Sequence, residues 1–299
     1  MTKTALILGA SGKIGRHGKS AFERAGWAVR SFDRKHGNLM RDAEGADVIV
    51  NGWNPPKYHD WARLIPDLTR QVTAAAKATG ATVIVPGNVY NLGDEPGEWS
   101  EATPHHPTTR KGRIREDMER AYEASGVRTI VLRAGNFIDP DHQDDVMSLL
   151  FLRAIERGKI TVPGAPNVLQ AYCYVPDWAR AAVGLAEKRA ELARFEDVPF
   201  PGHAFTAETL RVFLSRELGR PLGYASFPWW LFSALSPFWE LAREMLEMRY
   251  LWNTPHSLSG SKLARLLPDF RATPLEAVLR AGLPSSLARS GSLAEAAGG

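Results

Sequence analysis

Short apolar runs alternate with longer amphipathic stretches through the first half of the chain. The apolar runs predict buried strands at Thr4–Leu8, Ala28–Phe32, Asp47–Val50, Thr82–Val85 and Thr129–Leu132. Apolar residues recur at helical spacing between Trp61 and Ala78, and a further helix is predicted from about Arg110 to Ala124. Strands that alternate with helices predict an α/β fold with a doubly wound parallel sheet and helices on both faces.

The pattern changes beyond Pro140. A helix is predicted over Val146–Arg157, followed by short β-like pieces around Lys159–Val162 and Ala171–Val175. Asp177 is expected to act as the N-cap of the next helix, and the run Thr273-Pro274-Leu275-Glu276 is typical of a capping box that starts the last helix. The region from Pro199 onward is mainly helical and aromatic, and we expect its aromatic cluster to cover a ligand cavity.

Three glycines, Gly9, Gly12 and Gly15, follow the first predicted strand and precede a helix. Gly9 permits a tight turn, Gly12 lets backbone amides approach a pyrophosphate, and Gly15 lets the helix pack close to the strand. A second apolar strand ends near Asp33, where a carboxylate that binds ribose is expected. This context predicts a dinucleotide site in a Rossmann domain.

Composition narrows the class of protein. The chain has 299 residues, of which 44% are hydrophobic, so a large core is expected. Its net charge of +4 is spread without a long basic run, which argues against a nucleic-acid partner. Cys173 is the only cysteine, so cysteine zinc sites and internal disulfides are excluded. No apolar run has transmembrane length and the first strand starts near Met1, so we expect a cytoplasmic protein without a membrane partner.

The spacing Gly-x-x-Gly-x-x-Gly resembles the short-chain dehydrogenase/reductase superfamily in its extended or atypical branch. The likeness to the NAD-dependent epimerase/dehydratase group covers nearly the whole chain, and it implies a small-molecule substrate. Typical members carry a Ser or Thr after the fourth main strand and a Tyr-x-x-x-Lys pair on the next helix. Here Pro86, or its neighbour Gly87, stands at the hydroxyl position, and Lys111 and Arg115 fill the tyrosine and lysine positions.

Lys111, Arg115 and Glu119 form a Lys-x-x-x-Arg-x-x-x-Glu pattern on the predicted helix. This pattern is similar to the isoflavone reductase and phenylcoumaran benzylic ether reductase group, whose lysine is taken as the proton-transfer residue. The resemblance implies that Lys111 is the general acid/base, which requires its pKa to fall from near 10.4 towards about 7 to 8. The alternative is that Lys111 only binds ribose hydroxyls. Tyr90 and Asn88 are expected to orient the substrate.

The division into domains follows from these assignments. Residues 1–165, with part of 171–198, are predicted to form the Rossmann domain. Residues 199–284, with contributions from about 140–170, are predicted to form a smaller, mainly helical substrate domain, as the resemblance implies. Residues 285–299 are rich in Ser, Ala and Gly, and are expected to form a flexible tail.

Further site residues are predicted from their place at the carboxyl ends of strands or in the aromatic region. The cofactor candidates are Gly9, Ser11, Gly12, Lys13, Ile14, Gly15, Asp33, Arg34, Asn51, Gly52, Trp53, Pro86, Lys111 and Asn136. The substrate candidates are Asn54, Tyr90, Asn136, Phe137 and Trp229. Asp33 favours NAD because its carboxylate would repel a 2′-phosphate, whereas Arg34 and Lys35 leave NADP open. No metal-ligand spacing is visible.

The expected reaction is hydride transfer between a nicotinamide and a small carbonyl, alcohol or activated double bond, with Lys111 as acid/base. A nucleotide-sugar epimerase or dehydratase is an alternative, although the missing Ser/Thr and Tyr count against it. A non-catalytic regulator that senses NAD(P) is a second alternative. The substrate, the reaction direction and the oligomeric state stay open, a homodimer being one option.

Overall fold

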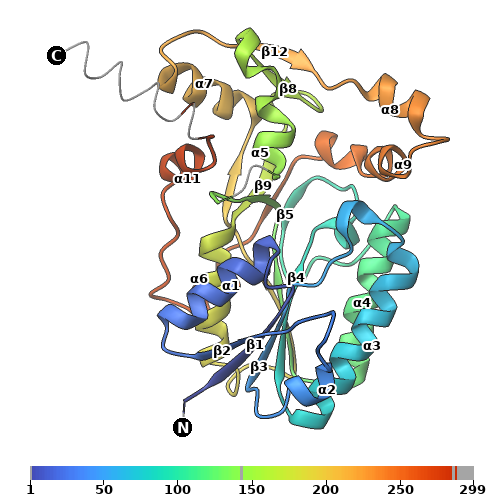
Figure 1. The fold of residues 1–299 in the computed structure, drawn as a ribbon. Helices are drawn as coiled ribbons and strands as arrows, with labels where there is room; N and C mark the ends of the chain where they lie inside the picture. Colours follow the sequence, from blue (N-terminus) through green and yellow to red (C-terminus); the bar gives the residue numbers. More distant parts are fainter. Residues whose placement is uncertain (1, 142–143, 285–286, 288–299) are drawn as a thin grey trace.

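A six-stranded parallel sheet forms the centre of the computed structural model, which describes residues 2–141, 144–284 and 287 (Figure 1). The strand order is β2-β1-β3-β4-β6-β10, and every neighbouring pair is parallel. The strands are β1 (Thr4–Leu8), β2 (Ala28–Ser31), β3 (Val48–Asn51), β4 (Thr82–Gly87), β6 (Thr129–Arg133) and β10 (Phe195–Pro199). This confirms the predicted α/β sheet.

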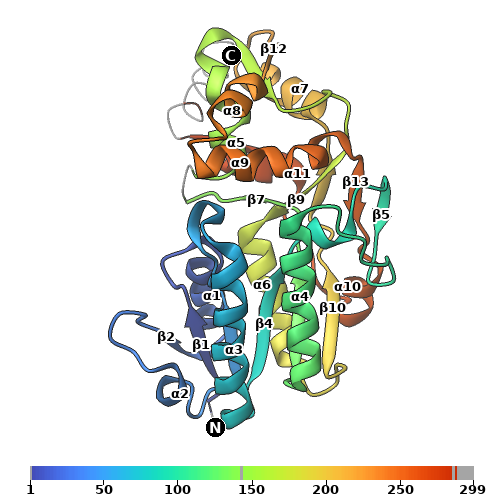
Figure 2. The ribbon, with the colours of Figure 1, turned by 90° about the vertical axis from the view of Figure 1, so that its right-hand side faces the viewer.

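Helices cover both faces of the sheet, so the expected doubly wound arrangement is confirmed (Figures 1 and 2). One face carries α1 (Lys13–Arg24) and α6 (Val175–Glu187), and the other carries α3 (Trp61–Thr79) and α4 (Arg110–Ser125). Side chains alternate along each strand, so one strand supplies both cores. In β1, Ala5 and Ile7 join the α1/α6 core, while Leu6 and Leu8 join the α3/α4 core.

The crossover after β2 is short. Only α2 (Leu39–Asp42) lies between β2 and β3, and β3 pairs with β1 on the side away from β2. The sheet therefore ends at β2, which agrees with the few residues available between the two predicted strands.

A second core lies beyond the carboxyl ends of the sheet strands (Figure 2). Its small sheets have the orders β11-β9-β7 and β12-β8, and a third small sheet, β13-β5, belongs to a separate cluster that contains Trp99 and Leu258. These strands are β5 (Gly97–Trp99), β7 (Asn136–Ile138), β8 (Lys159–Val162), β9 (Gln170–Tyr174), β11 (His203–Phe205), β12 (Gly223–Ser226) and β13 (His256–Leu258). The helices of this core are α5 (Val146–Leu149), α7 (Ala207–Glu217), α8 (Trp229–Leu235), α9 (Glu240–Glu247) and α11 (Leu275–Ala281), whereas α10 (Ser261–Leu266) packs beside β10 and places Leu263 in the α1/α6 core. Short 3-10 turns are η1 (Pro56–Tyr58), η2 (Tyr90–Leu92), η3 (Phe151–Arg157) and η4 (Arg249–Asn253).

Two predicted helix caps are wrong for one shared reason. Asp177 lies inside the first turn of α6, and its carboxylate accepts hydrogen bonds from the Thr273 amide at 2.6 Å and the Thr273 hydroxyl at 2.8 Å. Thr273 therefore caps no helix, and α11 begins after Pro274 without a side-chain cap. The hydrogen bonds between Asp177 and Thr273, which lie far apart in the sequence, thus take the place of the two predicted local caps.

Other expectations for the second half differ in detail. The predicted helix over 146–157 is interrupted at Leu150, where φ is −119°, so α5 is followed by the separate turn η3. In the aromatic segment, Trp229 and Phe232 are buried in the second core, whereas Trp230 and Phe238 are 74% and 91% exposed. The expected tail lies outside the described residues apart from Leu287. Among the described helices, none is long and apolar enough to cross a membrane.

Gly15 allows α1 to lie against the preceding loop. A Cβ at Gly15 would meet the Gly9 carbonyl oxygen at 2.1 Å and the Ala10 Cα at 2.7 Å, both of them backbone atoms. Gly18 lies in the same helix, and a Cβ there would first meet the Val50 Cγ1 at an ordinary 3.8 Å. The two glycines thus differ in the space available, although both are helical.

We expect Gly15→Ala to lower the free energy of unfolding by about 2 kcal/mol or more, because the loop must move. Gly18→Ala is the matched control, and it should be neutral or stabilising by up to about 1 kcal/mol, because alanine favours a helix. Urea denaturation of both variants measures the difference. Equal stability of the two would refute the close approach at Gly15.

Candidate functional site

The N-terminus of α1 offers unpaired backbone amides. Gly9 has a φ of 70°, and the loop closes with the Gly12 amide donating to the Gly9 carbonyl at 2.9 Å. Gly12 is the N-cap and supplies no side chain, and the first turn contains no acidic residue. The amides and the helix dipole therefore suit an anion at this position.

A cavity of about 630 Å³ extends from this loop along the carboxyl ends of the sheet strands to the second core. The sheet side contributes residues from Ser11 to Arg16, Gly52 to Asn54, Pro86 to Tyr90 and Ala134 to Phe137. The opposite wall comes from Gln170, Met248, Leu251, Trp252 and His256. A cleft at this edge is where open α/β sheets place their ligands.

The cavity brings together most of the residues that the sequence singled out. Those that line it are Ser11, Gly12, Lys13, Ile14, Gly52, Trp53, Asn54, Pro86, Asn88, Tyr90, Asn136 and Phe137. Gly9 lies in the loop and Gly15 in the first turn of α1, and neither lines the cavity. The roles assigned to these residues stay predictions.

Other predicted residues lie away from the cavity lining. The Asp33 carboxylate is solvent-exposed and accepts from the Lys35 amide and from His36 Nδ1, each at 2.8 Å, and these bonds lower the pKa of Asp33. Arg34 is exposed beside it. Asn51 is buried and donates to the Tyr122 hydroxyl at 2.9 Å. Trp229 is buried in the second core, where its indole donates to the Pro163 carbonyl.

Lys111 is fully buried, and its ammonium forms ion pairs with Glu244 and Glu247 of α9. Glu247 also accepts from the Lys111 amide at 2.7 Å, and Glu244 accepts from Arg110 at the same distance. These carboxylates compensate the cations that crowd the start of α4, a position that the helix dipole disfavours for cations. The ion pairs of Lys111 with Glu244 and Glu247 therefore join α4 to α9, and Lys111 lies outside the cavity lining.

Arg115 is the cation that the α4 helix presents to the cavity. It is 6% exposed, donates to the Pro86 carbonyl and leaves its Nε without a partner among the described residues. Burial lowers the pKa of Arg115, but a guanidinium stays protonated in proteins. Its charge is therefore available to an oxygen-rich ligand.

Two tyrosine hydroxyls meet in the cavity wall, those of Tyr58 and Tyr90, 3.3 Å apart. Burial raises the pKa of Tyr90, while the hydrogen bond to Tyr58 and the charge of Arg115 oppose that rise. The Asn88 side chain accepts from the Tyr90 amide at 3.0 Å and so holds the turn that carries this tyrosine. These groups can donate hydrogen bonds and share a proton.

Sequence reasoning missed the loop that carries Tyr58. Lys57, Tyr58 and Asp60 all have positive φ, at 53°, 62° and 45°, although none is glycine. Glu240 of α9 holds this loop by accepting from His59 at 2.9 Å. Backbone strain of this kind is often retained at binding sites. The adjacent Pro55-Pro56 pair was the only local signal.

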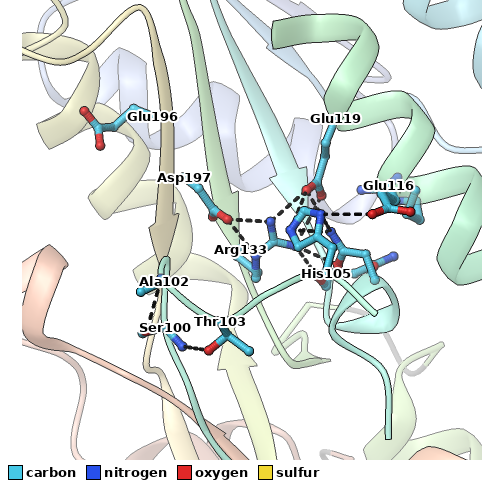
Figure 3. A network of polar contacts seen from close by, with 12 residues as sticks. Ser100, Ala102, Thr103, His105, Glu116, Glu119, Arg133, Glu196 and Asp197 are labelled. Carbon is cyan, nitrogen blue, oxygen red and sulfur yellow. Dashed lines mark hydrogen bonds and ion pairs between the residues drawn. The ribbon is translucent and has the colours of Figure 1, made fainter. Parts of the chain in front are cut away.

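Arg133 organises the strand ends behind the cavity (Figure 3). Its fully buried guanidinium contacts Glu119 at 2.8 Å and Asp197 at 2.7 Å, and it donates to the Asn88 carbonyl at 2.6 Å. Burial acts to lower the pKa of Arg133, but attraction to the two carboxylates outweighs it and raises the pKa. For Asp197 burial prevails and raises the pKa. The charge of Arg133, which keeps its proton, opposes this rise.

Two clusters of His, Asp and Glu have their potential ligand atoms close together. One contains His17, Asp139 and Asp141, and the other contains His105, Glu119 and Asp197. In each cluster an arginine already contacts the carboxylates, Arg16 in the first and Arg133 in the second. These guanidinium groups supply the positive charge that a metal would otherwise provide.

No family model matches the chain, and no curated protein sequence is similar to it. Solved structures do share its fold. MoeE5 in complex with UDP-glucose and NAD is 18% identical with a TM-score of 0.71, over 93% of this chain and 97% of that one. UDP-glucose 4-epimerase from Brucella ovis in complex with NAD is 18% identical with a TM-score of 0.72, over 94% and 97%.

UDP-glucuronic acid 4-epimerase from Bacillus cereus, in complex with UDP-glucuronic acid and NAD, is 14% identical with a TM-score of 0.70. The match covers 97% of this chain and 99% of that one. The chain therefore shares its fold with these three proteins, each solved in complex with NAD.

Lys111→Met should lower the free energy of unfolding by about 3 kcal/mol, because it leaves the carboxylates of Glu244 and Glu247 without their ammonium partner. Arg113→Met, at an exposed position of the same helix, should change it by less than about 0.5 kcal/mol. Urea denaturation at pH 7 compares the two. Wild-type stability of the Lys111 variant would contradict the stabilising role of its ion pairs with Glu244 and Glu247.

Proposed function

We propose that the protein is an NAD-dependent enzyme of the epimerase/dehydratase type, which exchanges a hydride with a hydroxyl-bearing carbon of a small molecule. One observation carries the proposal: a single cavity joins the open amides of α1 to the hydroxyl pair of Tyr58 and Tyr90. An anion site and a proton-handling site in one cleft are what such a reaction needs.

The residues that line the cavity fit the cofactor. The pyrophosphate would bind the first-turn amides of Lys13 and Ile14, where α1 has no side-chain cap and no acidic residue. Trp53, Pro86 and Asn136 would lie along the rest of the dinucleotide. When bound, NAD would accept a hydride from the substrate and return it. Asp33 supports NAD over NADP through its negative charge alone, since it lies outside the cavity lining.

Tyr90 is the group that we propose moves the proton of the substrate hydroxyl. It faces the cavity beside Arg115, whose charge favours the deprotonated form, and it shares a hydrogen bond with Tyr58. The Asn88 side chain would hold Tyr90 in place by accepting a hydrogen bond from the Tyr90 backbone amide. The role of Lys111 as acid/base stays a prediction from the resemblance; its side chain is paired with Glu244 and Glu247 and lies outside the cavity lining.

A nucleotide sugar is the substrate class that the comparisons favour, since UDP-glucose and UDP-glucuronic acid occupy two structures of this fold. A smaller alcohol or carbonyl compound is the other candidate. The two share hydride exchange at a hydroxyl-bearing carbon. A protein that binds NAD but exchanges no hydride with either class would instead be a regulator.

Gly12→Asp should abolish NAD binding without harming the fold. Aspartate is a good N-cap, and the extended backbone of Gly12, with a φ of −81°, can accommodate it. The carboxylate of the new aspartate would occupy the pyrophosphate site and repel the pyrophosphate. Gly12→Ala is the matched control, since it adds a Cβ without charge and should bind NAD more tightly than the aspartate variant. Calorimetric titration with NAD and NADP measures both. Wild-type NAD affinity of Gly12→Asp would rule out this cofactor site.

A further inference from the structure

Gln170 of β9 and His256 of β13 lie in the wall of the cavity formed by the C-terminal segments. They are 4% and 2% exposed. Each has one buried side-chain polar atom, Gln170 Oε1 and His256 Nε2, that has no hydrogen-bond partner among the described residues. Buried polar atoms are rarely left without partners, so each of these two acceptors needs a donor from the cavity, either a water molecule or a group of a bound ligand that displaces it.

The orientation of the Gln170 amide is fixed by its neighbours. Its Nε2 donates to the Leu251 carbonyl at 2.8 Å and to the Thr254 carbonyl at 3.1 Å. Carbonyl oxygens only accept, so the nitrogen must lie on that side. The atom that remains unpartnered is therefore the acceptor Oε1.

The tautomer of His256 follows from the same reasoning. Its Nδ1 lies 2.9 Å from the Thr254 carbonyl and must carry the hydrogen that is donated to it. The ring stacks on Trp99 at a centroid distance of 4.5 Å and an angle of 12°, and burial lowers the pKa of His256. The imidazole is thus neutral, and its Nε2 presents a lone pair.

Two lone pairs without a donor select the chemistry of the ligand. An anionic oxygen such as a phosphate would find no hydrogen to accept from these two atoms. An ammonium group would lack a counter-charge, because Asp144 is the one carboxylate among the described residues that line the cavity, and it pairs with Lys13. Neutral hydroxyl groups satisfy both conditions, with one hydroxyl hydrogen donated to each acceptor.

We propose that Gln170 Oε1 and His256 Nε2 form a subsite that binds neutral hydroxyl groups of the substrate, one at each atom. This inference rests on the proposed function in so far as the same cavity holds the cofactor. The hydroxyls could belong to a free polyol or sugar, or to the hexose of a nucleotide sugar. In both cases the subsite orients the substrate through its hydroxyls, and phosphate groups bind elsewhere.

Nitrogen-15 NMR of the histidine side chains in the wild-type protein tests the subsite directly. Without ligand, the His256 Nε2 resonance should be that of an unprotonated nitrogen. Ethylene glycol at molar concentration and UDP-glucose are the two probes, the first for a free diol and the second for a nucleotide-linked sugar. At least one should shift the Nε2 resonance as it accepts a hydrogen bond, whereas inorganic pyrophosphate should not.

Variants extend the test to affinity. His256→Phe keeps a ring to stack on Trp99 and removes the acceptor, so the probe that shifts the resonance should bind roughly tenfold more weakly, the loss expected for one hydrogen bond. His203→Phe, at a histidine outside the cavity lining whose ring contacts the Thr273 carbonyl, is the matched control and should bind as wild type does. NAD affinity, titrated in parallel, should be unchanged in both.

The outcomes separate the two proposals. Failure of the wild-type protein to bind NAD would count against the proposed function and not against the subsite. A protonated Nε2, a shift caused by pyrophosphate, or no shift with either hydroxyl probe would overturn the subsite. So would an unchanged probe affinity in a folded His256→Phe variant. If only UDP-glucose shifts the resonance, the hydroxyl comes from a nucleotide sugar; a shift with ethylene glycol alone indicates a free polyol.

Discussion

The buried charge of Arg133 is the constraint on which the cavity edge depends. It ends β6 and joins Glu119 of α4, Asp197 of β10 and the Asn88 carbonyl in one network. Removing one member would leave the others charged and buried, which is strongly unfavourable. Arg133 therefore helps to hold the turn from Asn88 to Tyr90, which positions the Tyr90 side chain.

The two buried cations of α4, Lys111 and Arg115, differ in how their charges are paired. Lys111 has its charge satisfied by Glu244 and Glu247, so it serves to join α9 to α4. Arg115, one turn further along α4, faces the cavity with an unpartnered nitrogen. Positive charge is thus concentrated on the sheet side of the cleft, while the wall at Gln170 and His256 is neutral. This asymmetry suits a charged cofactor on one side and a hydroxylated substrate on the other.

Sequence patterns predicted what local forces determine. The strands, α3, α4 and the glycine loop follow from periodicity and from backbone freedom at Gly9, which neighbouring residues alone decide. The caps at Asp177 and Thr273 were wrong because these residues, 96 positions apart, bond to each other. The pairing of Lys111 with Glu247, across 136 positions, was equally invisible. Gln170 and His256 carry no motif, and only the fold brings them into one wall.

The central claim is that the cleft between the glycine loop and Tyr90 holds NAD. A crystal structure of the protein grown with NAD tests it most directly. The pyrophosphate is expected on the amides of Lys13 and Ile14, and the nicotinamide end of the cofactor towards Tyr90 and Arg115. A dinucleotide bound elsewhere, or a cleft that stays empty at saturating NAD, would contradict it.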